Sequence, residues 1–425
     1  MKILQIVEES PSLDFTVPIY EFLDKEDKIL VYSTKSTYEH WYDHDPINLL
    51  VNNKKIDFLT IVDSTKLSSL YKKILKLGTR NNRDNINNFF HKIINKLFNE
   101  IIDITSKPVD FFEDYFDGLP DLILIETRND LKPNRVNKKI FNWINKNLIK
   151  SIGVPVSSYT LEGVKWSPIE PFGKSNLGYK PFNDFPKNYE YWLASKQPFV
   201  IEQLNETPHK IVGYPGVDSK WLNLFKYDHV GKNSSNEVNI LLNIRHFGQK
   251  RNLEPAKGKY VYEDVFNFFY TLKTYIDSLD GIKVNLFIKP HYYVNFKSFE
   301  EIFNKLGIKN YEFLRTSIYN SLKNMNFVIG LHSSVNLIST LAGIPTLLFP
   351  QVLTEKFKNE DFKTKTIYEG LQGYCKNEDE FKLKFELFLD KEKREEILQK
   401  DKKHLRGFFE DGTIEDIKKY LISLA

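Results

Sequence analysis

The sequence predicts an α/β protein built from two Rossmann-like domains that face a cleft, and three observations lead to this prediction. The chain has 425 residues, well beyond the size of about 250 residues at which one hydrophobic core stops growing. Short apolar runs alternate with helical segments, which is the order expected for a parallel sheet covered by helices. This alternation breaks once, in a polar stretch near the middle, and then starts again.

In the first half, runs rich in Ile, Leu and Val predict buried parallel strands. They lie at 2–7, 28–33, 57–63, 121–127, 154–159, 192–196 and 210–214. The helical segments of this half are at 65–104, 135–150 and 198–204. Prolines and glycines between 163 and 190 predict a long irregular loop, and long loops in compact domains are often functional.

The second half repeats the pattern with strands at 238–245, 284–289, 311–314, 327–331 and 346–349. Its helices are predicted at 261–279, 299–306, 318–324 and 335–342, with charged helices after them. We therefore expect one domain at 1–215, a polar linker at 216–236 and a second domain at 237–405. A final helix at 406–425 could return to the first domain.

The composition excludes several classes of protein. Sixty basic and 56 acidic residues give a net charge of +4, which argues against a nucleic-acid partner. The single cysteine, Cys375, excludes an intrachain disulfide and a cysteine-rich metal site. Metal-binding and Gly-rich phosphate-loop motifs are missing, so we expect neither a metal nor a cofactor. No signal peptide or membrane span is recognisable, which predicts a cytoplasmic protein and leaves peripheral attachment to the inner membrane open.

A serine pair in the second half suits phosphate binding. Gly330 ends a predicted strand, and Ser333 and Ser334 open the helix that follows. Free backbone N–H groups, serine hydroxyls and the helix dipole together favour an anion. The alternative is that a serine only caps the helix. The carboxyl end of a parallel strand is where ligands of open α/β sheets bind, so we favour the phosphate site.

Basic residues follow two other strands of the same sheet. Lys289 and His291 stand at the end of one strand, where the histidine could protonate a phosphate oxygen as a nucleotide leaves. Arg245 opens a basic loop after another strand, and its cations suit a diphosphate. An exposed, solvated loop is the alternative reading of that segment.

These motifs together resemble those of bacterial surface-polysaccharide glycosyltransferases. Lys289-Pro290-His291, the serine pair and Gly343-Ile344-Pro345 are similar to motifs of capsule Kdo transferases, bacterial sialyl- and polysialyltransferases, and CDP-glycerol glycerophosphotransferases. The segments 210–218 and 409–413 are similar to further motifs of these enzymes. The resemblance implies the GT-B fold and transfer from a nucleotide-activated donor, with a CMP-linked sugar favoured and CDP-glycerol or a UDP-sugar left open.

An inverting transfer also needs a base for the acceptor hydroxyl. Glu162 with Gly163 partly matches the acidic motif of the sialyl and Kdo transferases, although Leu161 replaces its first acidic residue. Glu126 and Glu9 follow other strands of the first half and are the alternative bases. Each of the three carboxylates could instead cap a helix.

The sequence therefore predicts an inverting, metal-independent glycosyltransferase. The second domain would hold the donor nucleotide, and the first would hold a glycan or lipid-linked glycan acceptor destined for the cell surface. Two alternatives stay open, a nucleotide-sugar epimerase of the same fold and an inactive module that binds a glycan or nucleotide.

Overall fold

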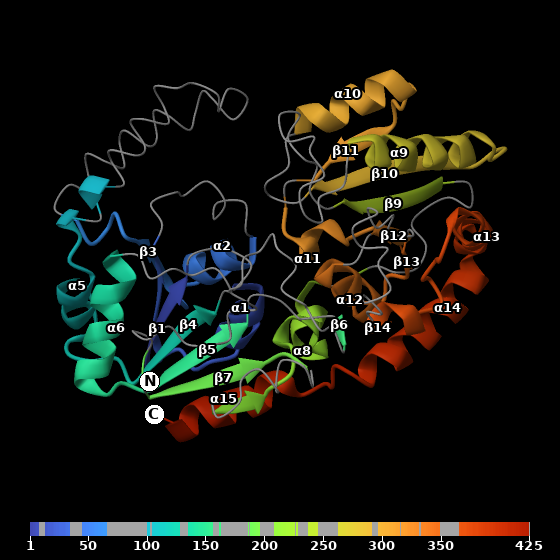
Figure 1. The fold of residues 1–425 in the computed structure, drawn as a ribbon. Helices are drawn as coiled ribbons and strands as arrows, with labels where there is room; N and C mark the ends of the chain where they lie inside the picture. Colours follow the sequence, from blue (N-terminus) through green and yellow to red (C-terminus); the bar gives the residue numbers. More distant parts are fainter. Residues whose placement is uncertain are drawn as a thin grey trace.

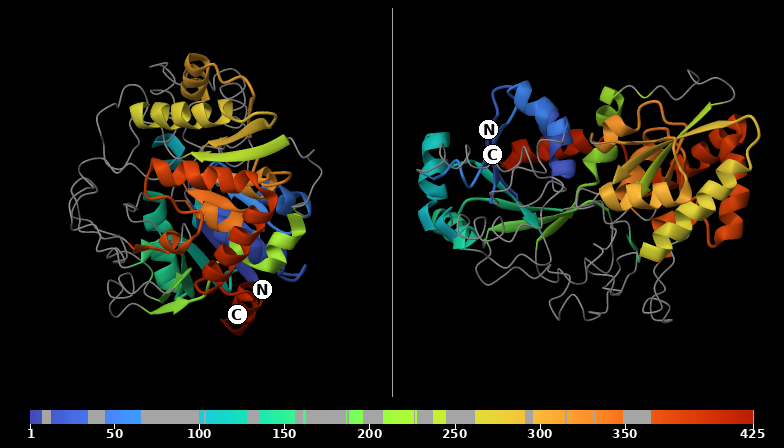
Figure 2. Two further views of the ribbon diagram at one scale, coloured as in Figure 1. Left: turned by 90° about the vertical axis from the view of Figure 1, so that its right-hand side faces the viewer. Right: turned by 90° about the horizontal axis from the view of Figure 1, so that it is seen from above.

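The computed structural model describes most of both predicted domains. It covers residues 1–7, 13–34, 45–65, 100–102, 104–127, 135–155, 161–162, 186, 188–195, 208–225, 227, 237–244, 262–290, 296–314, 316–330, 333–348 and 365–424. These residues form a seven-stranded and a five-stranded parallel sheet, each in its own lobe (Figures 1 and 2). The expectation of two tandem α/β units is confirmed.

The first sheet has the strand order β3-β2-β1-β4-β5-β7-β8. Its strands are β1 (Lys2–Val7), β2 (Lys28–Ser33), β3 (Asp57–Thr60), β4 (Leu122–Thr127), β5 (Ser151–Pro155), β7 (Tyr189–Leu193) and β8 (His209–Ile211). Apolar side chains cover both faces, as the continuous Ile/Leu/Val runs predict. One face packs on α1 (Leu13–Glu21) and α2 (Asp45–Asn52). The other packs on α5 (Pro108–Phe116) and α6 (Arg135–Asn147).

The second sheet has the order β11-β10-β9-β12-β13. Its strands are β9 (Glu237–Ile244), β10 (Lys283–Pro290), β11 (Tyr311–Phe313), β12 (Phe327–Gly330) and β13 (Thr346–Leu348). Helices α9 (Tyr262–Asp277), α10 (Phe296–Leu306) and α13 (Glu378–Leu389) cover one face. Helices α11 (Ile318–Ser321) and α12 (Ser334–Leu341) cover the face that belongs to the core shared with the first lobe.

The chain between the sheets is packed into that shared core. It forms η2 (Pro215–Val217), α8 (Ser219–Leu222) and η3 (Asn223–Phe225). Trp221 is fully buried and packs edge-on against Tyr319, whose hydroxyl donates to the Gly216 carbonyl at 3.2 Å. The first part of the predicted linker therefore differs from an exposed polar connection, because its Trp and Phe are core residues. The domain limits themselves stay a prediction.

The last two helices run from one lobe to the other. Helix α14 (Lys391–Arg406) packs beside the second sheet, and α15 (Thr413–Leu424) lies along the first lobe near both termini (Figures 1 and 2). Lys418 Nζ forms an ion pair with Asp24 at 2.8 Å. The Tyr420 hydroxyl donates to Glu190 at 2.6 Å. These contacts tie the end of the chain to the first lobe.

Several strand limits differ from those predicted. Strand β5 begins at Ser151 and includes Gly153, whereas the prediction started at residue 154, because its register partners in β4 and β7 extend the pairing. Strand β7 begins three residues earlier than predicted. Strand β3 stops at Thr60, whose N–H is taken up by Asp63 at 2.8 Å. The predicted helices at 65–104 and 198–204, and the loop at 163–190, fall largely outside the described residues.

None of the helices in the described ranges is both long and apolar enough to cross a bilayer.

Candidate functional site

The carboxyl ends of three neighbouring strands bring together one row of residues in the second sheet. Asn243 in β9 has Lys289 of β10 and Gly330 of β12 as its register partners. Side chains alternate between the faces of a strand. Asn243 therefore shares the face of Leu241, which belongs to the core cluster that includes α12. The row lies at the carboxyl edge, on the face covered by α12.

Asn243 is the residue that the sequence analysis missed. Its side chain is only 7% exposed, and its amide nitrogen Nδ2 has no hydrogen-bond partner among the described residues. A buried donor without a partner is costly, and buried polar groups are nearly always satisfied. The amide is therefore suited to donate to an oxygen of a bound ligand. The only sequence signal was an asparagine near the end of a strand whose centre is apolar.

The start of α12 lies beside this row. Ser333 is the N-cap of the helix, and its Oγ accepts a long hydrogen bond of 3.4 Å from the Val335 N–H. Ser334 is the first helical residue and is half-buried. A Cβ on Gly330 would lie 2.4 Å from Oδ1 of Asn336, so a larger residue there would displace the Asn336 side chain from its place in the first turn. Ser333 therefore caps the helix, whose N-terminus lies beside the carboxyl edge of the sheet.

Glu162 reaches the second lobe through a separate pair of short strands. Strand β6 (Leu161–Glu162) pairs antiparallel with β14 (Lys365–Thr366), and Glu162 is the register partner of Lys365. This differs from the expectation that Glu162 simply follows a strand of the first sheet. The turn η5 (Ile367–Gly370) comes directly after β14, and its Tyr368 hydroxyl donates to the Ser333 carbonyl at 2.6 Å.

The alternative bases lie elsewhere. Glu126 is 1% exposed near the end of β4, in register with Val154 on the face covered by α1. Glu9, Arg245 and His291 fall outside the described residues. The structure thus brings Lys289, Gly330 and the serine pair together and places the strand of Glu162 near them, while Glu126 belongs to the first sheet.

The whole chain can be compared with solved structures. No family model and no curated protein matches it. The S. aureus MnaA–UDP co-structure is 14% identical, with a TM-score of 0.55 over 100% of this chain and 97% of that one. The UDP-N-acetylglucosamine 2-epimerase from Rickettsia bellii is also 14% identical, with a TM-score of 0.53 over 100% and 96%. An E. coli structure of trehalose-6-phosphate bound with UDP-2-fluoro glucose is 10% identical, with a TM-score of 0.50 over 100% and 98%.

The fold is GT-B. Both lobes and their connection take part in the match, because the similarity covers the full length of this chain. At these identities the comparison defines the architecture alone. The chemistry of this GT-B protein must be inferred from its own residues.

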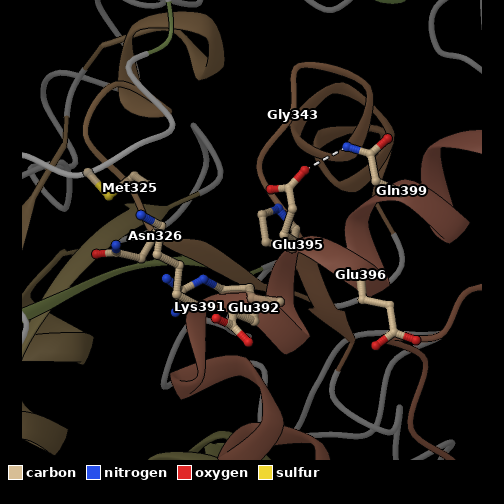
Figure 3. Close-up of a pocket in the computed structure, with 10 residues that line it drawn as sticks. Met325, Asn326, Gly343, Lys391, Glu392, Glu395, Glu396 and Gln399 are labelled. Carbon is tan, nitrogen blue, oxygen red and sulfur yellow. Dashed lines mark hydrogen bonds between the residues drawn. The ribbon is translucent and has the colours of Figure 1, made fainter.

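A cavity lies at the opposite edge of the same sheet. It has a volume of about 540 Å³ and is lined by Met325 and Asn326 before β12, by Gly343 and Pro345 before β13, and by the first turns of α14 (Figure 3). Its charged lining residues are Lys391, Glu392, Arg394, Glu395 and Glu396. Ligands of open α/β sheets bind at the carboxyl ends of the strands, whereas this cavity lies at the amino ends. We therefore take the row around Asn243 as the candidate site of the GT-B fold.

Proposed function

We propose that the protein is a glycosyltransferase that binds the nucleotide of an activated sugar at the carboxyl edge of its second sheet. The observation that carries the proposal is the buried Asn243 amide, which has no partner among the described residues and lies in register with Lys289 and Gly330. A donor, a cation and a helix N-terminus would then be available to one ligand. That combination suits a phosphate oxygen.

The donor phosphate would contact residues of three adjacent strands. The N–H groups at the start of α12, with Ser333 and Ser334, would bind one phosphate. Neighbouring strands lie about 4.8 Å apart, so Asn243 is positioned for a second phosphate or for the sugar. Lys289 would balance the negative charge. Arg245 and His291 follow the same two strands as Asn243 and Lys289, and we assign them to the leaving phosphate.

The proposed transfer is a displacement with inversion. A carboxylate takes the proton of the acceptor hydroxyl, whose oxygen forms a bond to the anomeric carbon. The bond from that carbon to the phosphate oxygen breaks, and the nucleotide leaves with the electron pair. His291 would protonate or hydrogen-bond this phosphate. We assign the base to Glu162, because β6 is paired with β14 close to the serine loop, and keep Glu126 and Glu9 as alternatives.

Two observations point to different donors. The motif resemblance favours a CMP-linked sugar for a surface-glycan acceptor, whereas the similar solved structures contain UDP or UDP-2-fluoro glucose. A thermal-shift screen with CMP, CDP, UDP and GDP separates them. A ligand at 100 times its dissociation constant stabilises a protein by about 2.7 kcal/mol. If none of the four nucleotides raises the unfolding temperature, the proposal is wrong.

An epimerase is the second candidate. The observation in its favour is the similarity to the Rickettsia bellii UDP-N-acetylglucosamine 2-epimerase over the full length of this chain. Incubation with a nucleotide sugar and no acceptor discriminates between the candidates by the product formed. A transferase should release the free sugar slowly by hydrolysis, an epimerase should give the epimeric nucleotide sugar, and a binding module should leave the substrate unchanged.

A further inference from the structure

Two segments that are distant in the sequence form a small sheet between the lobes. Leu161 and Glu162 lie in the sequence between β5 and β7 of the first sheet, yet their register partners are Thr366 and Lys365 of the second half. Figure 1 shows β6 beside β14, on the side of the molecule where α12 lies. The backbone of the proposed base is therefore held by the same half of the chain that carries the phosphate site.

Tyr368 links this small sheet to α12. It stands two residues after β14, is fully buried and belongs to the core cluster shared by both lobes. Its hydroxyl donates to the Ser333 carbonyl at 2.6 Å, and the same carbonyl accepts from the Asn336 N–H at 3.0 Å. One side chain thus connects the N-cap of α12 with the strand that pairs with Glu162.

The segment after Tyr368 is fixed in place. The Asp401 carboxylate accepts hydrogen bonds from the N–H groups of Gln372 at 2.6 Å and Gly373 at 3.4 Å. A Cβ on Gly373 would lie 2.0 Å from the Thr346 carbonyl oxygen. The Leu348 N–H donates to the Gly373 carbonyl at 2.9 Å. Because residues of β13 and α14 both hydrogen-bond to this segment, the backbone that follows Tyr368 is fixed in position.

We propose that Tyr368 is a positioning residue that couples the strand of Glu162 to the phosphate-binding start of α12. It holds the Ser333 peptide in one orientation and keeps β14, and with it β6, at a fixed distance from that peptide. The proposal deepens the proposed function and rests on it for the roles of Glu162 and Ser333. The structural coupling of β6 and β14 to the start of α12 through Tyr368 can be tested independently of that function.

The test compares Tyr368→Phe with Tyr420→Phe in the full chain. Both variants keep the ring and lose a hydroxyl that donates at 2.6 Å, but Tyr420 bonds Glu190 in β7 of the first sheet and not the small sheet or α12. In Tyr368→Phe we expect about fivefold faster hydrogen exchange in peptides that contain 161–162 and the first turn of α12, since one ordinary hydrogen bond is worth about that factor. Tyr420→Phe should leave those peptides unchanged. Parent-like exchange at 161–162 in Tyr368→Phe overturns the coupling, whether or not a nucleotide binds.

Steady-state kinetics distinguish the loss of a positioning contact from a general loss of rigidity in the protein. With UDP-N-acetylglucosamine or a CMP-linked sugar, Tyr368→Phe should lower kcat about tenfold and leave KM within about twofold, since a positioning loss of about 1.4 kcal/mol is tenfold in rate. The double variant with Glu162→Gln should be no slower than Glu162→Gln alone, because coupled residues are not additive. Fully additive losses would overturn the coupling. A parent enzyme that turns over neither donor would count against the proposed function, and hydrogen exchange would still decide the role of Tyr368.

Discussion

Asn243 and Gly330 are register partners on neighbouring parallel strands, and both lie on the face that α12 covers. Gly330 has no Cβ that would clash with the Asn336 side chain of that helix, while Asn243 has a buried amide donor without a partner among the described residues. A buried donor that has no partner within the described ranges is suited to bind a ligand. The predictions below follow from this pair and its neighbours.

Asn243→Ala should weaken nucleotide binding without a matching loss of stability. A hydrogen bond to a charged group contributes about 1.5–3 kcal/mol, so calorimetry should show a dissociation constant about 10–100 times higher. Asn239→Ala, on the same strand and face at the other end, is the control. It should bind nucleotide like the parent and be less stable than Asn243→Ala, because the Asn239 amide donates to the Asn324 carbonyl at 3.0 Å. Equal affinities in the two variants would remove Asn243 from the site.

Ser333→Asp separates capping from phosphate binding. Aspartate caps a helix as well as serine does, so the unfolding temperature should be preserved. Its negative charge should repel a phosphate and abolish nucleotide binding in the same calorimetric assay. Asn377→Asp makes the same change of charge at the N-cap of α13 and should bind normally. If Ser333→Asp binds nucleotide as the parent does, the serine is only a cap.

Glu162→Gln should lower turnover by about 10²–10⁴-fold, which is the usual contribution of a positioned general base, and leave donor affinity nearly unchanged. His291→Ala should lose a similar factor, and a donor with a better leaving group should restore its activity. The same donor should not rescue Glu162→Gln. Steady-state rates of both variants, measured with the ordinary donor and with the donor that has the better leaving group, test these roles. Wild-type turnover of Glu162→Gln would transfer the role of base to Glu126 or Glu9.

Gly216→Ala should destabilise the junction between the lobes. The new methyl group would lie 2.8 Å from the Tyr319 hydroxyl and 3.1 Å from the Asp14 carbonyl oxygen. Overpacking of this kind costs about 1–3 kcal/mol, which urea unfolding can measure. Gly407→Ala is the control, because its methyl group would meet only the His404 carbonyl oxygen, at 3.2 Å. Equal unfolding midpoints for the two variants would show that the junction is loosely packed.

Asp401 should make stability depend on pH. Burial raises the pKa of its carboxyl from 3.8 to about 6, although two backbone N–H groups donate to it. Between about pH 4 and pH 6 the folded protein then binds more protons than the unfolded chain, so this contribution falls as the pH rises. Relative to Asp401→Asn, the free energy of unfolding of the parent should drop by about 3 kcal/mol over that interval. A difference that stays constant from pH 4 to pH 7 would contradict this assignment.

The strands of the fold could be predicted from the sequence because they are continuous Ile, Leu and Val runs. Their limits were less predictable, since the limits of β5 and β7 depend on partners across the sheet. The segment with Trp221 was predicted to be a linker from its polar composition. In the structure its few large aromatic side chains decide its position in the core.

Candidate site residues could be proposed from the sequence where they stand at or just after the end of a strand, as Lys289, Gly330 and Ser333 do. Asn243 was missed because one polar residue at the end of a strand looks like an ordinary strand terminator. Tyr368 was missed because its contact with Ser333 spans 35 residues, and no local pattern predicts a contact between such distant positions. The pairing of Glu162 with Lys365 was missed for the same reason.

The most direct test of the central claim is a crystal structure of the full chain with UDP, or with CMP if that nucleotide stabilises it more. We predict phosphate density at the carboxyl edge of the second sheet, within hydrogen-bond distance of Asn243 Nδ2 and the first N–H groups of α12. Density instead in the cavity between Asn326 and α14, at the opposite edge (Figure 3), would contradict the proposed site.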